Sequence, residues 1–142
     1  MIYTKLTKKA LKLCFEVHKE QIDKSGMPYV FHPFLLATQM KDEATTICAL
    51  LHDVVEDSEY TLEDIRKLGF PSEVIDALAL LTHDSSVPYM EYVKEFRSNP
   101  IAKQVKLADL RHNSDLTRLD VVDEGMLQRL VKYKKSIEIF VE

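Results

Sequence analysis

Chain breakers are scarce in this chain of 142 residues, which contains only three Gly and five Pro. Because glycine and proline are the strongest interruptions of regular structure, long segments can run as uninterrupted helix. Apolar residues recur at helical spacing along most of the chain, and no segment shows the alternation typical of a strand. We therefore expect an all-α fold, a compact helical bundle that forms a single domain over residues 1–142.

The positions of the breakers and of the apolar stripes predict where the helices lie. Pro33 and Pro100 suit the first turn of a helix, where the missing N–H has no partner to lose. Residues 61–64 resemble a capping box, and Gly69 resembles a C-terminal stop. The expected helices cover about residues 6–20, 33–40, 43–55, 61–68, 72–82, 88–98, 100–113 and 127–141, and the loop 23–29 is the least helical segment.

Composition excludes several classes of function. Apolar residues make up 46% and charged residues 30%, a balance that supports a packed core and a solvated surface. The net charge of -4 provides no basic field for a nucleic acid polymer. Cys14 and Cys48 lie in apolar helical patterns, which indicates reduced core thiols in a cytoplasmic protein. The lysine-rich N-terminus and the lack of a long apolar run argue against secretion and membrane insertion.

Two polar residues, His52 and Asp53, stand inside the most apolar predicted helix, residues 43–55. An ionised carboxylate away from water needs a charged partner, dense hydrogen bonding or a metal. No Lys or Arg lies between Glu43 and Tyr60 to pair with Asp53. Glu56 and Asp57 follow one turn later, where negative charge at a helix C-terminus opposes the helix dipole, so a functional reason for them is favoured.

A third carboxylate, Asp109, follows Leu107 and Ala108 in a segment that should also be packed. His32 stands at the mouth of the helix that Pro33 begins. Two imidazoles and two carboxylates are a mixed nitrogen and oxygen donor set, which suits Mn²⁺, Fe²⁺ or Zn²⁺ better than Ca²⁺. The candidate metal ligands are therefore His32, His52, Asp53 and Asp109.

The order and spacing of these residues resemble a known family. His52 follows His32 by 20 residues, and Asp109 follows Asp53 by 56 residues. This H…HD…D pattern is similar to that of the HD-domain metal-dependent phosphohydrolases. More narrowly, the chain resembles the alarmone hydrolase domain of RelA/SpoT homologues in four ordered blocks: His18-Lys19 with Gln21, Lys24-Ser25-Gly26 through Pro28-Tyr29 to His32-Pro33, the segment 49–57 (ALLHDVVED), and Lys106-Leu107-Ala108-Asp109 with His112-Asn113.

The resemblance implies an HD-domain helical bundle that hydrolyses (p)ppGpp at the 3′ position, releasing pyrophosphate, with Mn²⁺ as cofactor and Fe²⁺, Ni²⁺ or Zn²⁺ as alternatives. Its partner would be a small phosphorylated nucleotide. Carried over residue by residue, the roles would be metal ligation by His32, His52, Asp53 and Asp109, activation of water by Glu56 and Asp57, and nucleotide binding by Lys24, Ser25 and Asn113.

The chain departs from the family pattern at Asp23, where the family commonly has an Arg that packs on the guanine base. An anion in place of a stacking cation removes a cation–π contact and would repel a polyanion. Leu110-Arg111 inverts the usual order, so we expect Arg111 to point away from the pocket. Two alternatives stay open: an HD-type nucleoside 5′-monophosphate phosphatase, and a non-catalytic nucleotide-binding regulatory module. His18 and His83 are expected to be structural, Asn113 could be a helix cap, and the oligomeric state is open.

Overall fold

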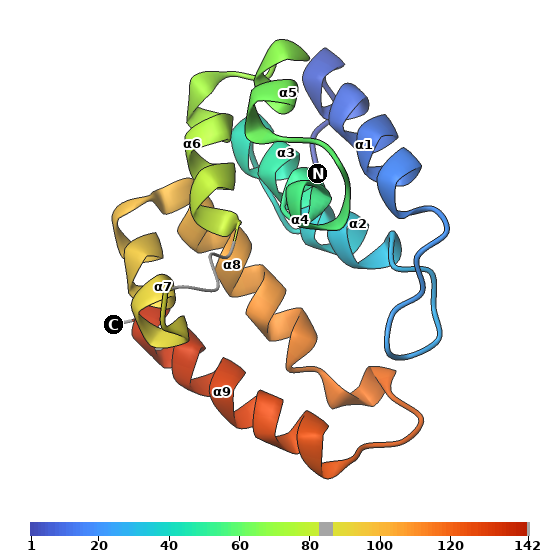
Figure 1. Cartoon of the computed structure of the whole chain (residues 1–142), viewed down its shortest axis with the longest axis vertical. Helices are drawn as coiled ribbons and strands as arrows, with labels where there is room; N and C mark the ends of the chain where they lie inside the picture. Colours follow the sequence, from blue (N-terminus) through green and yellow to red (C-terminus); the bar gives the residue numbers. More distant parts are fainter. Residues whose placement is uncertain (83–86, 142) are drawn as a thin grey trace.

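The computed structural model describes residues 1–82 and 87–141, and within these ranges the chain is helical and forms no β-strand (Figure 1). The prediction of an all-α fold is confirmed. His83 lies outside the described residues. The helices are α1 (Lys5–His18), α2 (Phe31–Thr38), α3 (Glu43–Leu51), α4 (Val54–Asp57), α5 (Leu62–Lys67), α6 (Ser72–Leu81), α7 (Tyr89–Glu95), α8 (Pro100–Asn113) and α9 (Glu124–Val141), with 3₁₀ turns at Phe96–Ser98 and Leu116–Arg118.

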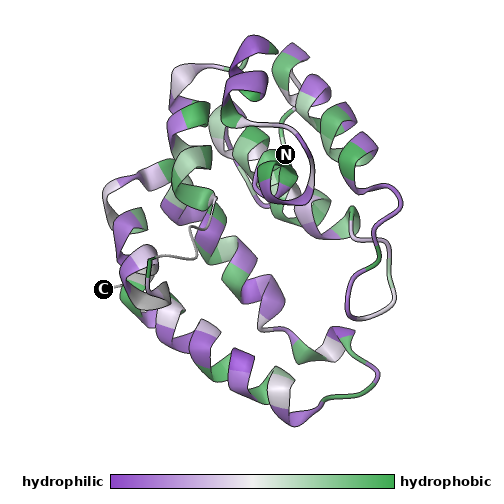
Figure 2. Ribbon diagram, in the orientation of Figure 1, coloured by the Kyte–Doolittle hydropathy of each residue, from purple (hydrophilic) through white to green (hydrophobic). Residues whose placement is uncertain are grey.

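Helix α3 forms the centre of the core, and its residues 45–51 are all buried. It packs against α1, α2, α6 and α8, and α8 packs in turn against α9. Figure 2 shows hydrophobic segments gathered where α1, α3 and α6 face one another, whereas α8 and α9 alternate between hydrophilic and hydrophobic segments. The amphipathic pattern of the sequence therefore buries one continuous apolar cluster around α3.

The predicted helix ends are confirmed where local chemistry fixes them. Thr61 and Asp64 form a reciprocal capping box at the start of α5. Gly69 has a φ of +100° just after that helix, in the left-handed region that glycine adopts at helix ends. Asn99 caps α8 by accepting from the Ala102 N–H at 3.0 Å, and Pro100 occupies the first turn.

The predicted continuous helix over residues 43–55 is wrong, because the helix breaks at His52 and Asp53. α3 ends at Leu51, Asp53 has φ −106° and ψ 0°, and α4 then begins at Val54. The His52 Nδ1 atom lies 2.7 Å from the Ala49 carbonyl oxygen. In a continuous helix, that oxygen would accept from the N–H of Asp53, so the imidazole competes for the bond that would extend the helix.

Smaller differences concern two other helix starts. α2 begins at Phe31, so His32 lies in the first turn of the helix rather than before it. α9 begins at Glu124, three residues earlier than the apolar stripe predicts. Among the described residues, no helix combines the length and the apolar character needed to cross a bilayer.

Candidate metal centre

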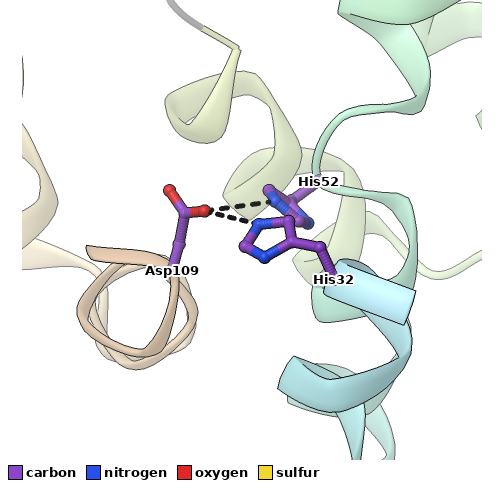
Figure 3. Close-up of side chains that lie close together, drawn as sticks. All are labelled: His32, His52 and Asp109. Atoms are coloured by element: carbon purple, nitrogen blue, oxygen red, sulfur yellow. Dashed lines mark hydrogen bonds and ion pairs between the residues drawn. The ribbon is translucent and has the colours of Figure 1, made fainter. Parts of the chain in front are cut away.

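Three helical elements bring together the side chains of His32, His52 and Asp109 (Figure 3). His32 comes from the first turn of α2, His52 follows the end of α3, and Asp109 lies in α8. One ligand atom from each side chain lies within 4.8 Å of the other two, and all three residues are buried. The Asp109 Oδ1 atom is 2.8 Å from His32 Nε2 and 3.6 Å from His52 Nε2.

The hydrogen bonds of His52 fit a metal ligand. A carbonyl oxygen can only accept, so His52 Nδ1 donates its proton to Ala49 O. In the neutral ring, Nε2 then carries the lone pair, and this buried atom has no hydrogen-bond partner among the described residues. Buried polar atoms are rarely left unpaired in this way. A divalent cation beside His52 Nε2 would satisfy that atom, and two nitrogens with one carboxylate are a suitable donor set.

Asp53 lies next to this cluster but not within it. Its Oδ2 atom is 3.1 Å from His52 Nε2 and accepts a hydrogen bond from the hydroxyl group of Tyr29. Burial raises the pKa of Asp53, but the nearby charge of His52 and the hydrogen bond from the Tyr29 hydroxyl outweigh it, so the pKa falls to about 2. Of the four candidate ligands, the structure thus brings three within mutual reach, and Asp53 contacts the cluster through His52.

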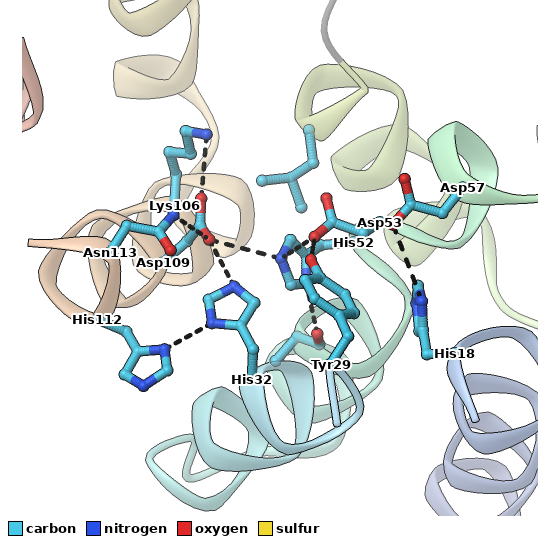
Figure 4. A network of polar contacts seen from close by, with 12 residues as sticks. His18, Tyr29, His32, His52, Asp53, Asp57, Lys106, Asp109, His112 and Asn113 are labelled. Atoms are coloured by element: carbon cyan, nitrogen blue, oxygen red, sulfur yellow. Dashed lines mark hydrogen bonds and ion pairs between the residues drawn. The ribbon is translucent and has the colours of Figure 1, made fainter. Parts of the chain in front are cut away.

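The charges around Asp109 are balanced by neighbours on its own helix (Figure 4). Lys106 Nζ lies 3.1 Å from Oδ2, and Asn113 Nδ2 donates to Oδ1 at 3.2 Å. Burial raises the pKa of Asp109, but Lys106 and the two histidines hold it well below its usual value. Burial conversely lowers the pKa of His52, yet Asp53 and Asp109 raise it well above its usual value. The cluster therefore has a strong local preference for positive charge.

The acidic pair Glu56 and Asp57 belongs to α4, one turn beyond the helix break, and both residues are exposed. The Asp57 Oδ2 atom accepts from Gln21 Nε2 at 3.2 Å and lies 3.8 Å from His18 Nδ1. His18 is fully buried, with Nδ1 2.8 Å from Gln21 Oε1. The first motif block thus folds back onto α4 and holds Asp57 in place.

A cavity of about 300 Å³ opens beside the cluster of His32, His52 and Asp109. It is lined by His32 and by the three predicted nucleotide-binding residues Lys24, Ser25 and Asn113. Residues 24 and 25 lie on the loop between α1 and α2, whereas Asn113 ends α8. The two motif blocks that the resemblance assigns to nucleotide binding therefore face the same space next to a candidate metal ligand.

Asp23, the departure from the family pattern, organises the loop that carries Lys24 and Ser25. Its Oδ1 atom accepts from the Ser25 N–H at 2.8 Å, the Ser25 hydroxyl at 2.6 Å and the Met27 N–H at 3.0 Å. Its other oxygen lies 3.9 Å from Arg118 Nη1. Burial raises the pKa of Asp23, but the bonds from Ser25 and Met27 and the charge of Arg118 lower it overall. Much of this negative charge is thus compensated within the protein.

Several residues of this region were not singled out by sequence reasoning. Arg118, Arg129 and Tyr133 line the cavity from the segment after α8 and from α9. No spacing in the sequence indicates that α9 lies beside the cavity. The sequence assigns no separate role to His112, and the structure places its ring against His32. Arg111 is exposed and is not among the residues that line the cavity.

Comparisons with known proteins agree with the family resemblance that the sequence motifs indicate. The chain is 33% identical over 153 aligned residues to a GTP pyrophosphokinase of Myxococcus xanthus, with 95% of this chain and 20% of that protein covered. It is 38% identical over 115 residues to the human guanosine-3′,5′-bis(diphosphate) 3′-pyrophosphohydrolase MESH1, with 71% of this chain and 64% of that protein covered. The chain thus spans less than two thirds of the length of these relatives. No family model matches the chain.

A solved structure supports the same relationship. It is described as a metazoan ortholog of SpoT that hydrolyses ppGpp, and it superposes with a TM-score of 0.79 at 29% identity. The superposition covers 99% of this chain and 88% of that chain. The predicted resemblance is therefore confirmed: in sequence and in fold, the chain is similar to proteins named for the hydrolysis of ppGpp.

Proposed function

We propose that this chain is an HD-type hydrolase that uses Mn²⁺ to release pyrophosphate from the 3′ position of (p)ppGpp. The observation that carries the proposal is the buried cluster of His32, His52 and Asp109, in which His52 Nε2 has no hydrogen-bond partner among the described residues. The MESH1 relative and the SpoT ortholog, both named for activity on ppGpp, support this substrate.

His32, His52 and Asp109 would hold the ion, with Asp53 as a fourth ligand beside His52. The mixed nitrogen and oxygen donors favour Mn²⁺, and Fe²⁺, Ni²⁺ or Zn²⁺ are the alternatives. When bound, such an ion lowers the pKa of water and polarises a phosphoryl oxygen. His52 keeps its ligand nitrogen directed at the cluster because its other nitrogen is bonded to the Ala49 carbonyl.

Glu56 and Asp57 would act on the attacking water. Glu56 is exposed and belongs to the short helix α4 that begins two residues after His52, so we assign it the acceptance of the water proton. Asp57 is held by Gln21 and would orient the same water. Attack at the phosphorus then breaks its bond to the 3′ oxygen, which leaves GDP from ppGpp and free pyrophosphate.

Lys24, Ser25 and Asn113 would bind the nucleotide in the adjacent cavity. A lysine is suited to a phosphate as a point charge, and hydroxyl and amide groups can bond to phosphate, sugar or base. Arg118 and Arg129 line the same cavity and would add positive charge for a polyanionic ligand.

The proposal also includes the domain organisation of the chain and the compartment in which it acts. We assign residues 1–142 to one HD domain, because the helices from α1 to α8 contribute side chains to one apolar cluster. The buried free thiols of Cys14 and Cys48 support a reducing compartment, and we place the reaction in the cytoplasm.

The test is product analysis with purified protein, ppGpp and Mn²⁺, alongside a panel of nucleoside monophosphates. Release of pyrophosphate and GDP, lost on chelation and restored by Mn²⁺, would support the proposal. Orthophosphate from monophosphates would indicate the nucleotidase alternative. Binding of Mn²⁺ and ppGpp with no cleavage of either substrate would indicate the regulatory module.

A further inference from the structure

His112 and His32 are linked ring to ring. The His112 Nδ1 atom lies 2.6 Å from His32 Nδ1, and the two rings are nearly parallel, with an angle of 14° between their planes (Figure 4). At this distance, one nitrogen must carry the proton and the other must accept it. The contact joins α2 to the last turn of α8, across 80 residues of chain.

The other nitrogen of His32 faces the metal cluster. His32 Nε2 lies 2.8 Å from Asp109 Oδ1, the same carboxylate oxygen that lies 3.6 Å from His52 Nε2. His32 can therefore ligate an ion in this cluster only through Nε2. For that atom to present a lone pair, the ring proton of neutral His32 must be on Nδ1, where its hydrogen-bond partner among the described residues is His112.

The two histidine ligands are thus oriented by different groups. The Nδ1 atom of His52 contacts a backbone carbonyl, which can only accept and therefore fixes the tautomer with its proton on Nδ1. His32 has an imidazole behind it, which can accept or donate. A group that accepts the proton of the second ring nitrogen commonly fixes the tautomer and the ring orientation of a metal-bound histidine.

We propose that His112 is a positioning residue that holds His32 in the orientation and tautomer needed to bind the divalent cation. The inference rests on the proposed metal centre and goes beyond it, because no role in metal or nucleotide binding has been assigned above to His112. In the metal-bound state, His112 accepts the Nδ1 proton of His32 through its own Nδ1, and its Nε2 carries the remaining proton.

A matched pair of variants tests this role. In His112→Asn, the amide oxygen can occupy about the position of the imidazole Nδ1 and can still accept from His32. In His112→Leu, a methyl group occupies that position and cannot accept. Arg111→Ala, an exposed neighbour on the same helix, is the control. Each protein is titrated with Mn²⁺ alone, and binding is followed by the loss of the electron paramagnetic resonance signal of free Mn²⁺.

We expect His112→Leu to weaken Mn²⁺ binding by about 10- to 100-fold, the usual effect of losing such a partner. His112→Asn should stay within a few-fold of the wild type, and Arg111→Ala should be unchanged. Wild-type affinity in His112→Leu would overturn the inference, as would equal losses in the Leu and Asn variants. A wild-type chain that binds no Mn²⁺ would overturn the metal centre and this role together. A chain that binds Mn²⁺ in the expected order but does not cleave ppGpp would overturn only the proposed substrate.

Discussion

His32, His52 and Asp109 are held by helices of the core, whereas Lys24 and Arg118 lie on the connections after α1 and after α8. These first three residues are at most 7% exposed, and α2, α3 and α8 pack directly against one another. Lys24 is exposed, and Arg118 is partly exposed. The proposed metal ligands thus lie on packed helices of the core, whereas part of the proposed nucleotide site lies on connecting segments, where sequence can change at little cost to the fold.

The largest effect should come from replacing one of the proposed metal ligands that the core helices hold, His32, His52 and Asp109. Asp109→Ala removes a candidate ligand and also leaves Lys106 without its carboxylate partner at 3.1 Å. We expect loss of Mn²⁺ binding and a fall in ppGpp hydrolysis of about 10³-fold or more, because metal catalysis supplies several kcal/mol. Isothermal titration with Mn²⁺ and a pyrophosphate assay measure the two effects. Asp120→Ala, an exposed carboxylate after α8, is the control, and retained Mn²⁺ affinity in Asp109→Ala would refute the ligand assignment.

Glu56→Gln separates catalysis from metal binding. The amide cannot take a proton from water, so the rate should fall by about 10²–10⁴-fold while Mn²⁺ affinity stays at the wild-type level. Glu59→Gln changes another exposed glutamate three positions later and should have little effect. If the two variants hydrolyse ppGpp equally fast, the assigned role of Glu56 is wrong.

A pH titration of the metal-free chain examines the helix break itself. The pKa of Asp53 is about 2 in the folded chain, below its ordinary value of 3.8. The charged carboxylate therefore stabilises the fold above pH 3.8, and this contribution is lost as the pH falls from 3.8 toward 2. Between about pH 5 and pH 2, the wild type should lose about 1–2 kcal/mol more stability than Asp53→Asn, as measured by denaturant unfolding in chelator. Parallel curves for the two proteins would contradict this shift.

The smallest effect is expected in the loop between α1 and α2, which carries Asp23, Lys24 and Ser25. Asp23→Ala removes the acceptor for the Ser25 and Met27 N–H groups and the partner of Arg118. We expect KM for ppGpp to rise about tenfold, near 1.4 kcal/mol, with kcat nearly unchanged, because the loop loses its order before binding. Glu20→Ala, just before the loop, is the control. A fall in KM would instead mean that Asp23 acts mainly by repelling the polyanion.

The part of this structure that sequence could predict is the part fixed by local chemistry. The capping box at Thr61 and the proline start of α8 are confirmed, because each depends on residues a few positions apart. The break at His52 was missed, since Val54 and Val55 continue the apolar pattern. There, a side-chain bond to the Ala49 carbonyl overrides the pattern and turns His52 toward the cluster.

The residues of the candidate site likewise fall into those that the sequence could predict and those that depend on tertiary packing. Ordered motifs predicted which residues would meet, and the structure brings His32, His52 and Asp109 within mutual reach. Arg129 and Tyr133 could not be predicted to line the cavity, because their position depends on how α9 packs against α8. The hydrogen bonds that compensate the negative charge of Asp23 depend on the fold of one loop, so they could not be predicted from the sequence either.

Anomalous diffraction at the manganese edge, from crystals soaked in Mn²⁺, tests the metal centre most directly. We expect one peak at bonding distance, roughly 2.0–2.3 Å, from a nitrogen of His32, a nitrogen of His52 and a carboxylate oxygen of Asp109. A soaked crystal with no peak there, or with its peaks only at surface carboxylates, would contradict this expectation.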